Sequence, residues 1–386
     1  MAAAAALIAA ILLATPRAQL DAAVATSAHA ASDYPGPLGG DAARSLDVEP
    51  GIKLLLQEPA LRLLGGYSAG VLLTNPGGAS VATRHSGLLS GSWKQNHNVE
   101  WVVSNRFRYG RSGLAWDPGS RRPFDSLDGL LPLISDELFA DGELGVTMLV
   151  ARRLTLDVAA GYFAYGGASA TSQQLVPLQQ GPQLYIGLTH ELTRNDQVGA
   201  ELYASHTVAS DNHRSSLLKS SVSWRRQIDA ATQAKISLGT SIDERWQPAR
   251  PSSLDVFPLV GAELQHDFLE RTRRVELRAL AAVEPHYSPL TADLQERAEL
   301  EASARFVLRE RFWVRVRGAA ARDLLAPAGG AQLWIAAVDT AIQLRNDLSL
   351  TAGAERVWQQ VAAGTPVPTA AWVAFASLTF TARDVL

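Results

Sequence analysis

The sequence predicts an all-β fold: a transmembrane antiparallel up-and-down β-barrel of about 16 strands, with a range of about 14–18. Three observations predict it. Long stretches alternate strictly between apolar and polar residues, Asp and Arg occur within them on one side of the alternation, and the connections between them alternate between longer and shorter. The stretches reach roughly 10–13 residues, whereas soluble strands average about 5–6 and a tilted strand that crosses a bilayer needs about 9–11.

The segment Thr232–Glu244 shows the alternation clearly. Successive side chains of a strand point to opposite faces of the sheet, so a period of two separates an apolar face from a polar one. One set contains Ala234, Ile236, Leu238 and Ile242, and the other contains Gln233, Lys235, Ser237 and Asp243. Repeated over the chain, this pattern is typical of a barrel with lipid outside and a polar lumen inside.

The N-terminal residues predict export from the cytoplasm. Met1–Ala14 is an apolar run, and Ala28-His29-Ala30 fits the small-x-small pattern for cleavage before Ala31. We expect residues 1–30 to be a signal peptide that is cleaved near Ala30. Because no Lys or Arg precedes the apolar run, an Ala-rich helix or an uncleaved anchor is the alternative.

Residues 31–61 are expected to be a flexible periplasmic segment, because they are rich in Gly, Pro, Ala and Asp as far as Pro50. Gly51–Leu61 is compatible with a short strand, a helical turn or a small plug. The transmembrane barrel is expected to occupy residues 62–386, with both termini and the short turns on the periplasmic side.

The strands follow one another along these residues. The alternation places them at Arg62–Asn75, Ser80–Lys94, Val99–Arg111, Glu143–Val150, Leu154–Tyr165, Gln183–Leu192, Gln197–Val208, Ser216–Gln227, Thr232–Glu244, Asp255–Gln265, Arg274–Glu284, Leu294–Leu308, Phe312–Arg322, Gln332–Leu344, Leu348–Trp358 and Ala371–Ala382. Pro258 and Pro285 need a bulge or a strand end, because proline cannot donate to a ladder.

Composition excludes several classes of function. The net charge of −3 gives no basic footprint for nucleic acid, and the absence of Cys removes disulfides, thiol catalysis and Cys-zinc sites. The eight histidines lack metal-ligand spacing, and no phosphate-binding or dinucleotide-binding glycine motif is present. We therefore expect no cofactor, no metal and no enzyme activity. The one cluster that merits inspection for catalysis is His206, Ser210, Asp211 and His213, for which a solvated loop is the alternative.

The last strand carries a family resemblance. Trp372, Ala374, Ala376, Leu378 and Phe380 alternate against Val373, Phe375, Ser377, Thr379 and Thr381. The chain thus resembles bacterial outer-membrane β-barrel proteins of the porin-like kind, over about residues 62–386. The resemblance implies a multi-pass location in a Gram-negative outer membrane, contact with outer-membrane lipid, and assembly by the barrel-assembly machinery. A fainter resemblance is to the barrel partners of polysaccharide export systems, which implies a periplasmic polysaccharide export protein as partner.

The polar sets of the strands predict the residues that line the lumen. These are Arg106, Arg108, Glu143, Asp157, Glu191, Glu201, Lys235, Glu276, Arg278, Arg297, Glu299, Glu301, Arg305, Arg315 and Arg317. Charged rings set selectivity in channels, so the functional interpretation is a pore for hydrophilic solutes. The alternative is that the same charges form salt bridges that brace the wall.

Two further groups of residues have alternative interpretations. Aromatic residues near the strand ends favour membrane interfaces, although scattered core aromatics would give the same pattern: Trp93, Trp101, Tyr109, Tyr162, Trp224, Phe306, Phe312, Trp372 and Phe380. The longest external loop, Ser112–Gly142, either folds inward as a constriction or lies on the surface.

Three functions remain open from the sequence. The first is an outer-membrane channel, with export of a secreted polysaccharide as the leading specific function and general diffusion as the other. The second is a closed-barrel outer-membrane enzyme or adhesin. The third is a soluble secreted all-β protein. Heat-modifiable migration on a gel together with outer-membrane fractionation separates the third from the first two.

Overall fold

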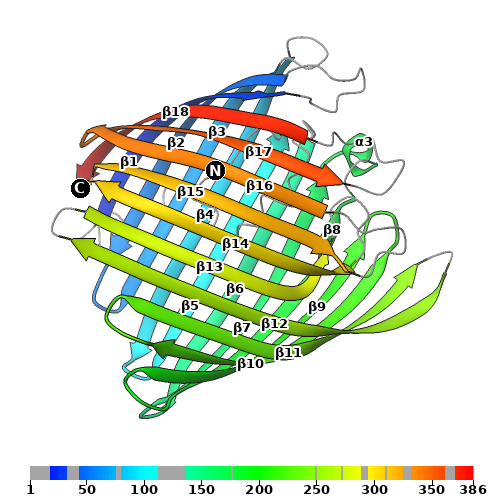
Figure 1. The fold of residues 1–386 in the computed structure, drawn as a ribbon. Coiled ribbons are helices and arrows are strands. Elements are labelled where there is room, and N and C mark those ends of the chain that lie inside the picture. Colours follow the sequence, from blue (N-terminus) through cyan, green and yellow to red (C-terminus); the bar gives the residue numbers. More distant parts are fainter. Residues whose placement is uncertain are drawn as a thin grey trace.

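The chain forms one closed β-barrel (Figure 1). The computed structural model describes residues 18–32, 43–74, 80–111, 136–174, 177–247, 250–270, 273–287, 294–308, 311–324, 332–360 and 370–385. These residues contain an 18-stranded antiparallel sheet that closes because β1 (Ala18–Ala31) pairs with both β18 (Ala370–Val385) and β2 (Ala43–Gln57). The all-β, up-and-down barrel is therefore confirmed, at the upper end of the expected strand count.

Each remaining strand pairs with its two neighbours in sequence. They are β3 (Leu61–Thr74), β4 (Ser80–Asn96), β5 (Val99–Arg111), β6 (Asp136–Ala151), β7 (Leu154–Gly167), β8 (Gln179–Glu191), β9 (Asp196–Ala209), β10 (Arg214–Gln227), β11 (Thr232–Gln247), β12 (Arg250–Glu270), β13 (Arg273–Tyr287), β14 (Leu294–Leu308), β15 (Phe312–Asp323), β16 (Gln332–Arg345) and β17 (Leu348–Gln360). All sixteen predicted strands are present as β3–β18. The strands β6 and β8 begin earlier than predicted, and the part of the Ser112–Gly142 loop before Asp136 lies outside the described residues.

The barrel begins at Ala18 rather than at Arg62. The strand β2 occupies about half of the segment predicted to be flexible, and all of β1 except Ala31 lies within the predicted signal peptide. Both are poor in the large β-branched residues that favour strands, and they form because closure gives each a hydrogen-bonded neighbour on both sides. Cleavage before Ala31 stays a prediction, and it would remove β1 from between β18 and β2.

In the described residues prolines lie inside four strands without a large bulge, and Pro182 of β8 pairs with Tyr162 of β7. The ladder between β2 and β3 skips Pro50. Pro258 pairs with Thr240 of β11, and Pro285 pairs with Glu296 of β14, but the ladder between β12 and β13 ends at the pair Val260 and Val283. The expected bulge or strand end at Pro258 is therefore wrong. The ladder between β12 and β13 does not reach this residue, so the proline interrupts no pairing with β13.

The two ends of the barrel differ in their connections. Short turns join β2 to β3, β4 to β5, β6 to β7 and each later even-numbered strand to its successor. The start of β1 and the end of β18 lie at this same end, since Gln19 pairs with both Leu55 and Val385. We call it the short-turn end and the opposite one the loop end. The loop end carries the short helix α3 (Ala170–Gln173), and no helix among the described residues is long and apolar enough to cross a membrane.

The two faces of the sheet differ as the alternation predicts. Large apolar side chains are exposed on one face, among them Leu202, Val222, Leu238, Leu300 and Trp334. The other face carries the charges, and several of them contact one another over an intervening strand. Because side chains converge only on the concave side of a curved sheet, the charged face is the inner face of the barrel.

Candidate functional site

The inner face of the barrel is the candidate site. The strand register places all fifteen residues predicted to line the lumen on this face. The register gives their position; their role in passing a solute stays a prediction. What the structure adds is which of these charges form ion pairs and which do not, and this difference divides the inner face into distinct regions.

The first region, the charge wall, consists of the inward charged residues of β13–β17. Many of its members form ion pairs with residues of opposite charge on neighbouring strands. Arg278 Nε lies 2.9 Å from Glu263 of β12, and Arg297 Nε lies 2.9 Å from Asp323. Arg305 contacts Glu276 at 3.4 Å and also lies over the Trp313 ring. These charges therefore neutralise one another.

The charge wall includes an ion pair that crosses a whole strand. Arg317 of β15 donates to Glu355 of β17 at 3.1 Å, over Ala337 of β16, which pairs with both residues in the register. Arg317 and Glu355 are 8 % and 7 % exposed. Glu301 is similarly buried and lies within electrostatic reach of Arg317, Arg278 and Arg315. A small residue at Ala337 is what lets the two long side chains meet.

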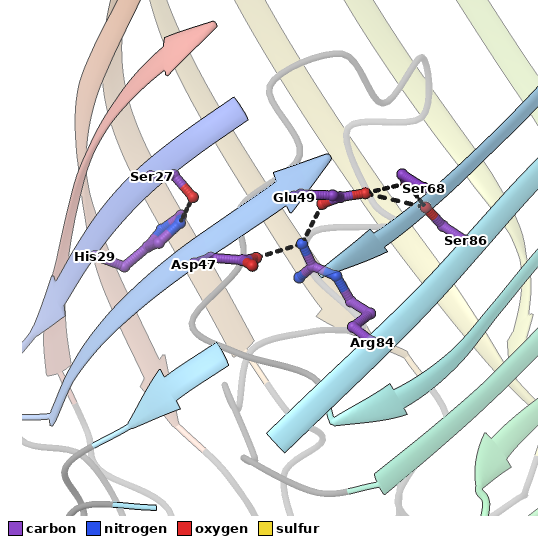
Figure 2. A network of polar contacts seen from close by, with 7 residues as sticks. All are labelled: Ser27, His29, Asp47, Glu49, Ser68, Arg84 and Ser86. Atoms are coloured by element: carbon purple, nitrogen blue, oxygen red, sulfur yellow. Dashed lines mark hydrogen bonds and ion pairs between the residues drawn. The ribbon is translucent and has the colours of Figure 1, made fainter. Parts of the chain in front are cut away.

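A second network braces the first strands of the barrel (Figure 2). Arg84 of β4 donates to both Asp47 and Glu49 of β2, and Glu49 accepts from Ser68 and Ser86. The guanidinium passes over β3 at Gly70, where an added Cβ would lie 3.1 Å from Asp47 Oδ1. Glycine there leaves room for the pair. Sequence reasoning missed Asp47 and Glu49 because it placed β2 outside the barrel.

A polar belt lies on the inner face of β5–β9, next to the second network. Arg106 donates to Asp141 at 2.9 Å, Gln183 Nε2 donates to Asp141 at 3.1 Å, and the Tyr203 hydroxyl donates to Gln183 at 3.2 Å. Gln183 crosses β7 at Gly161, where an added Cβ would lie 3.0 Å from its Nε2 atom. The belt links β5, β6, β8 and β9 at one height of the barrel.

A cavity of about 270 Å³ lies beside the belt, between β8 and β13. Its lining combines two aromatic rings, charged groups of both signs and hydroxyls: Tyr185, Glu201, Tyr203, Lys219, Ser221, Lys235, Ser237, Glu263 and Glu284. Lys219 Nζ reaches from β10 to β13, 3.8 Å from Glu284 and 3.5 Å from the carbonyl oxygen of Pro285. This is where β12 separates from β13, so the wall is hollowed where its ladder ends.

Three of the cavity's most prominent side chains were missed. Tyr185, Tyr203 and Lys219 have the same inward register as Glu201 and Lys235, which were predicted. The two-residue alternation alone identifies their face. The tyrosines were not predicted because aromatic residues were assigned to the membrane interfaces, whereas Lys219 has both the charge and the register of the predicted residues and was omitted. A count of aromatics in the polar set of each strand would have found both tyrosines.

The aromatic residues expected at the interfaces lie on the outer face. Trp93, Trp101, Trp224, Phe306 and Phe380 are exposed near the short-turn end, and Tyr109, Tyr162 and Trp372 are exposed near the loop end. These positions suit two interfacial girdles, and their contact with lipid stays a prediction.

The cluster considered for catalysis does not assemble into a triad in the described residues. His206 Nδ1 contacts Ser216 Oγ at 3.0 Å, His213 contacts Asp211 at 3.3 Å, and Ser210 Oγ accepts from the backbone N–H of Leu178. Asn212 takes a φ of 68°, which fits a tight turn between β9 and β10. Within the described part of the chain no group of three or more His, Asp or Glu side chains could hold a metal ion.

Solved structures with the same fold are bacterial outer-membrane proteins. The outer membrane protein opdK of Pseudomonas aeruginosa matches with a TM-score of 0.52 and 12 % identity, over 96 % of this chain and 100 % of its own. OccAB3 of Acinetobacter baumannii matches with a TM-score of 0.51 and 10 % identity, over 95 % and 99 %. At such identities the likeness shows the fold alone. A search of curated proteins gave no match.

The closed barrel, its charged inner face and these likenesses define a porin-like outer-membrane β-barrel. A comparison with protein families is more specific, and matches residues 138–386 to the EpsX exopolysaccharide export family. The match covers more than half of the chain, from β6 to the C-terminus, and includes the charge wall and the cavity. The chain belongs to the EpsX family.

Proposed function

We propose that this protein is the outer-membrane channel through which a secreted polysaccharide leaves the cell. The observation that carries the proposal is the EpsX match over β6–β18, the part of the barrel that holds the hollowed and charged inner wall. The alternative of a general diffusion channel rests only on the fold.

The inner face suits a hydroxyl-rich chain. A closed barrel satisfies its own backbone hydrogen bonds, so its lumen is free to present polar groups to a solute. Carboxylates, guanidinium groups and hydroxyls alternate around the inner face, and together they can accept from and donate to sugar hydroxyls. A bilayer core offers no such partners, which is why a glycan needs this route.

The partners follow from the proposed location. Outer-membrane lipid surrounds the apolar outer face, and the barrel-assembly machinery inserts the chain. A periplasmic polysaccharide export protein delivers the glycan to the short-turn end. Because the described turns at that end are short, the partner rather than the barrel supplies the periplasmic part of the pathway.

Deletion of the gene in its own host tests the proposal. We expect secreted polysaccharide to fall to background, periplasmic polysaccharide to accumulate, and a plasmid copy to restore secretion. Purified protein in planar bilayers should show discrete conductance. Normal secretion in the deletion strain, or loss of small-solute uptake with secretion intact, would contradict the proposal and favour general diffusion.

A further inference from the structure

The cavity between β8 and β13 has the chemistry of a sugar-binding site. We infer that Tyr185 and Tyr203 form a subsite in the lumen that holds one neutral sugar residue of the passing glycan. The inference deepens the proposed function and rests on it for the identity of the chain that is bound.

The tyrosines occupy adjacent strands at the same height. Tyr185 of β8 and Tyr203 of β9 are register partners on the inner face, and both side chains are half-buried. Aromatic rings combine an apolar, electron-rich face with a polar tip. The C–H face of a pyranose ring is its apolar side and carries slight positive charge, so it packs favourably on such a ring.

The surrounding residues hold the two rings in place. An added Cβ at Gly187 would lie 2.6 Å from the Tyr185 hydroxyl and 3.0 Å from two of its ring carbons, so the Tyr185 side chain leans along its strand with its hydroxyl end over this glycine. The Tyr203 hydroxyl donates to Gln183, which is fixed in turn by Asp141. Rings that are fixed before binding lose little conformational entropy when a ligand arrives.

Beyond the rings the cavity offers charged groups and hydroxyls. Lys235 and Glu201 line it without an ion-pair partner among the described residues, while Ser221 and Ser237 add hydroxyls. Glu263 and Glu284 are paired with Arg278 and Lys219. One free amine and one free carboxylate offset each other, so the site favours an uncharged ligand with donors and acceptors.

The size of the cavity also fits one sugar residue. Its volume of about 270 Å³ is room for several waters. A single sugar residue with its hydroxyls fits such a space, and the adjoining residues of the chain continue along the open lumen.

Single-channel recording with maltohexaose, a neutral oligosaccharide, tests the subsite. We expect maltohexaose to interrupt the current of the wild-type channel, and Tyr185→Ala and Tyr203→Ala each to shorten the mean interruption roughly fivefold, because each removes one aromatic contact. Tyr185→Phe keeps the ring and should keep the wild-type duration. Tyr162→Ala is the matched control, since that tyrosine is exposed on the outer face of β7.

Unchanged single-channel conductance shows that each variant is folded. Wild-type currents that maltohexaose does not interrupt, or interruptions that neither tyrosine variant shortens, would overturn the subsite. An oligogalacturonide that is held longer than maltohexaose would overturn its preference for neutral sugars. The gene deletion tests the export function separately. If deletion abolishes secretion but the interruptions do not depend on either tyrosine, the export function is supported and only the subsite is contradicted.

Discussion

The charge wall lies beside the strands β8–β12, which we call the cavity wall, in one sheet. The two regions differ in whether their charged side chains form ion pairs. In the charge wall Arg297, Arg315 and Arg317 each meet a carboxylate within about 3 Å, and Asp339 and Glu355 are buried. In the cavity wall, Lys235 and Glu201 face the lumen with no such partner among the described residues. The same residue types therefore brace one region and remain available to a solute in the other.

The difference comes from the residues between the charges. Ala337 is small, so Arg317 reaches Glu355 across the intervening strand and the two side chains form an ion pair that covers this part of the wall. In the cavity wall, small residues such as Gly187, Gly261 and Ser237 add little side-chain volume between the longer side chains. Charge in a strand's polar set thus indicates the inner face, whereas the size of the neighbouring residues decides between bracing and binding.

Breaking the charge wall should have the largest effect. Arg317→Met leaves Glu355 buried without its partner, and we expect a loss of about 3–5 kcal/mol in the free energy of unfolding. Urea unfolding in detergent micelles, followed by heat-modifiable migration on a gel, measures it. Combining Arg317→Met with Glu355→Gln should recover most of the loss, because no buried charge is then left alone. A single variant as stable as the wild type would show that this pair does not brace the barrel.

Changing the cavity wall should alter conduction rather than stability. Lys235→Glu reverses a lumen charge that has no ion pair to lose among the described residues, so we expect the channel to become more cation-selective while stability changes by about 0.5 kcal/mol or less. The reversal potential in a salt gradient measures selectivity. Arg152→Glu makes the same change in charge at an exposed turn and serves as the control. Equal shifts in both variants would argue against a role for Lys235 in the lumen.

The smallest expected effect concerns the turn that joins β10 to β11 in the cavity wall. The Asp229 carboxylate accepts from the backbone N–H groups of Ala231 and Thr232 and from the Thr232 hydroxyl, and these bonds lower its pKa. A carboxyl whose pKa is lower in the folded state adds stability above its unfolded pKa and loses it as the pH falls through the folded pKa.

Unfolding curves over acidic pH test this contribution. Wild type should be slightly more stable than Asp229→Asn at neutral pH, and the difference should vanish in acid once Asp229 is protonated. A difference that stays constant across the pH range would show that the carboxylate charge is not its source.

Local sequence patterns were enough to predict most of the barrel strands and the face on which their side chains lie. Sixteen strands and the inward face of all fifteen lumen residues follow from the two-residue alternation, because side-chain direction along a strand depends on its own backbone. The strands β1 and β2 were missed because alanine, Pro50 and short polar residues give a weak local signal. The partner of β1 that closes the barrel, β18, lies at the other end of the chain, so only the closed structure shows this pairing.

The sequence by itself determined that this protein is a barrel of long amphipathic strands with a hydrophilic interior, since periodicity is a property of neighbouring residues. Only the tertiary structure decided which charged side chains form ion pairs and which face the lumen without an ion-pair partner among the described residues. Arg84 meets Asp47 over Gly70, and Arg317 meets Glu355 over Ala337, because the curvature of the closed sheet brings the side chains of alternate strands together. The same curvature, with small residues beneath Tyr185 and beside Lys235, leaves the cavity where the glycan is proposed to bind.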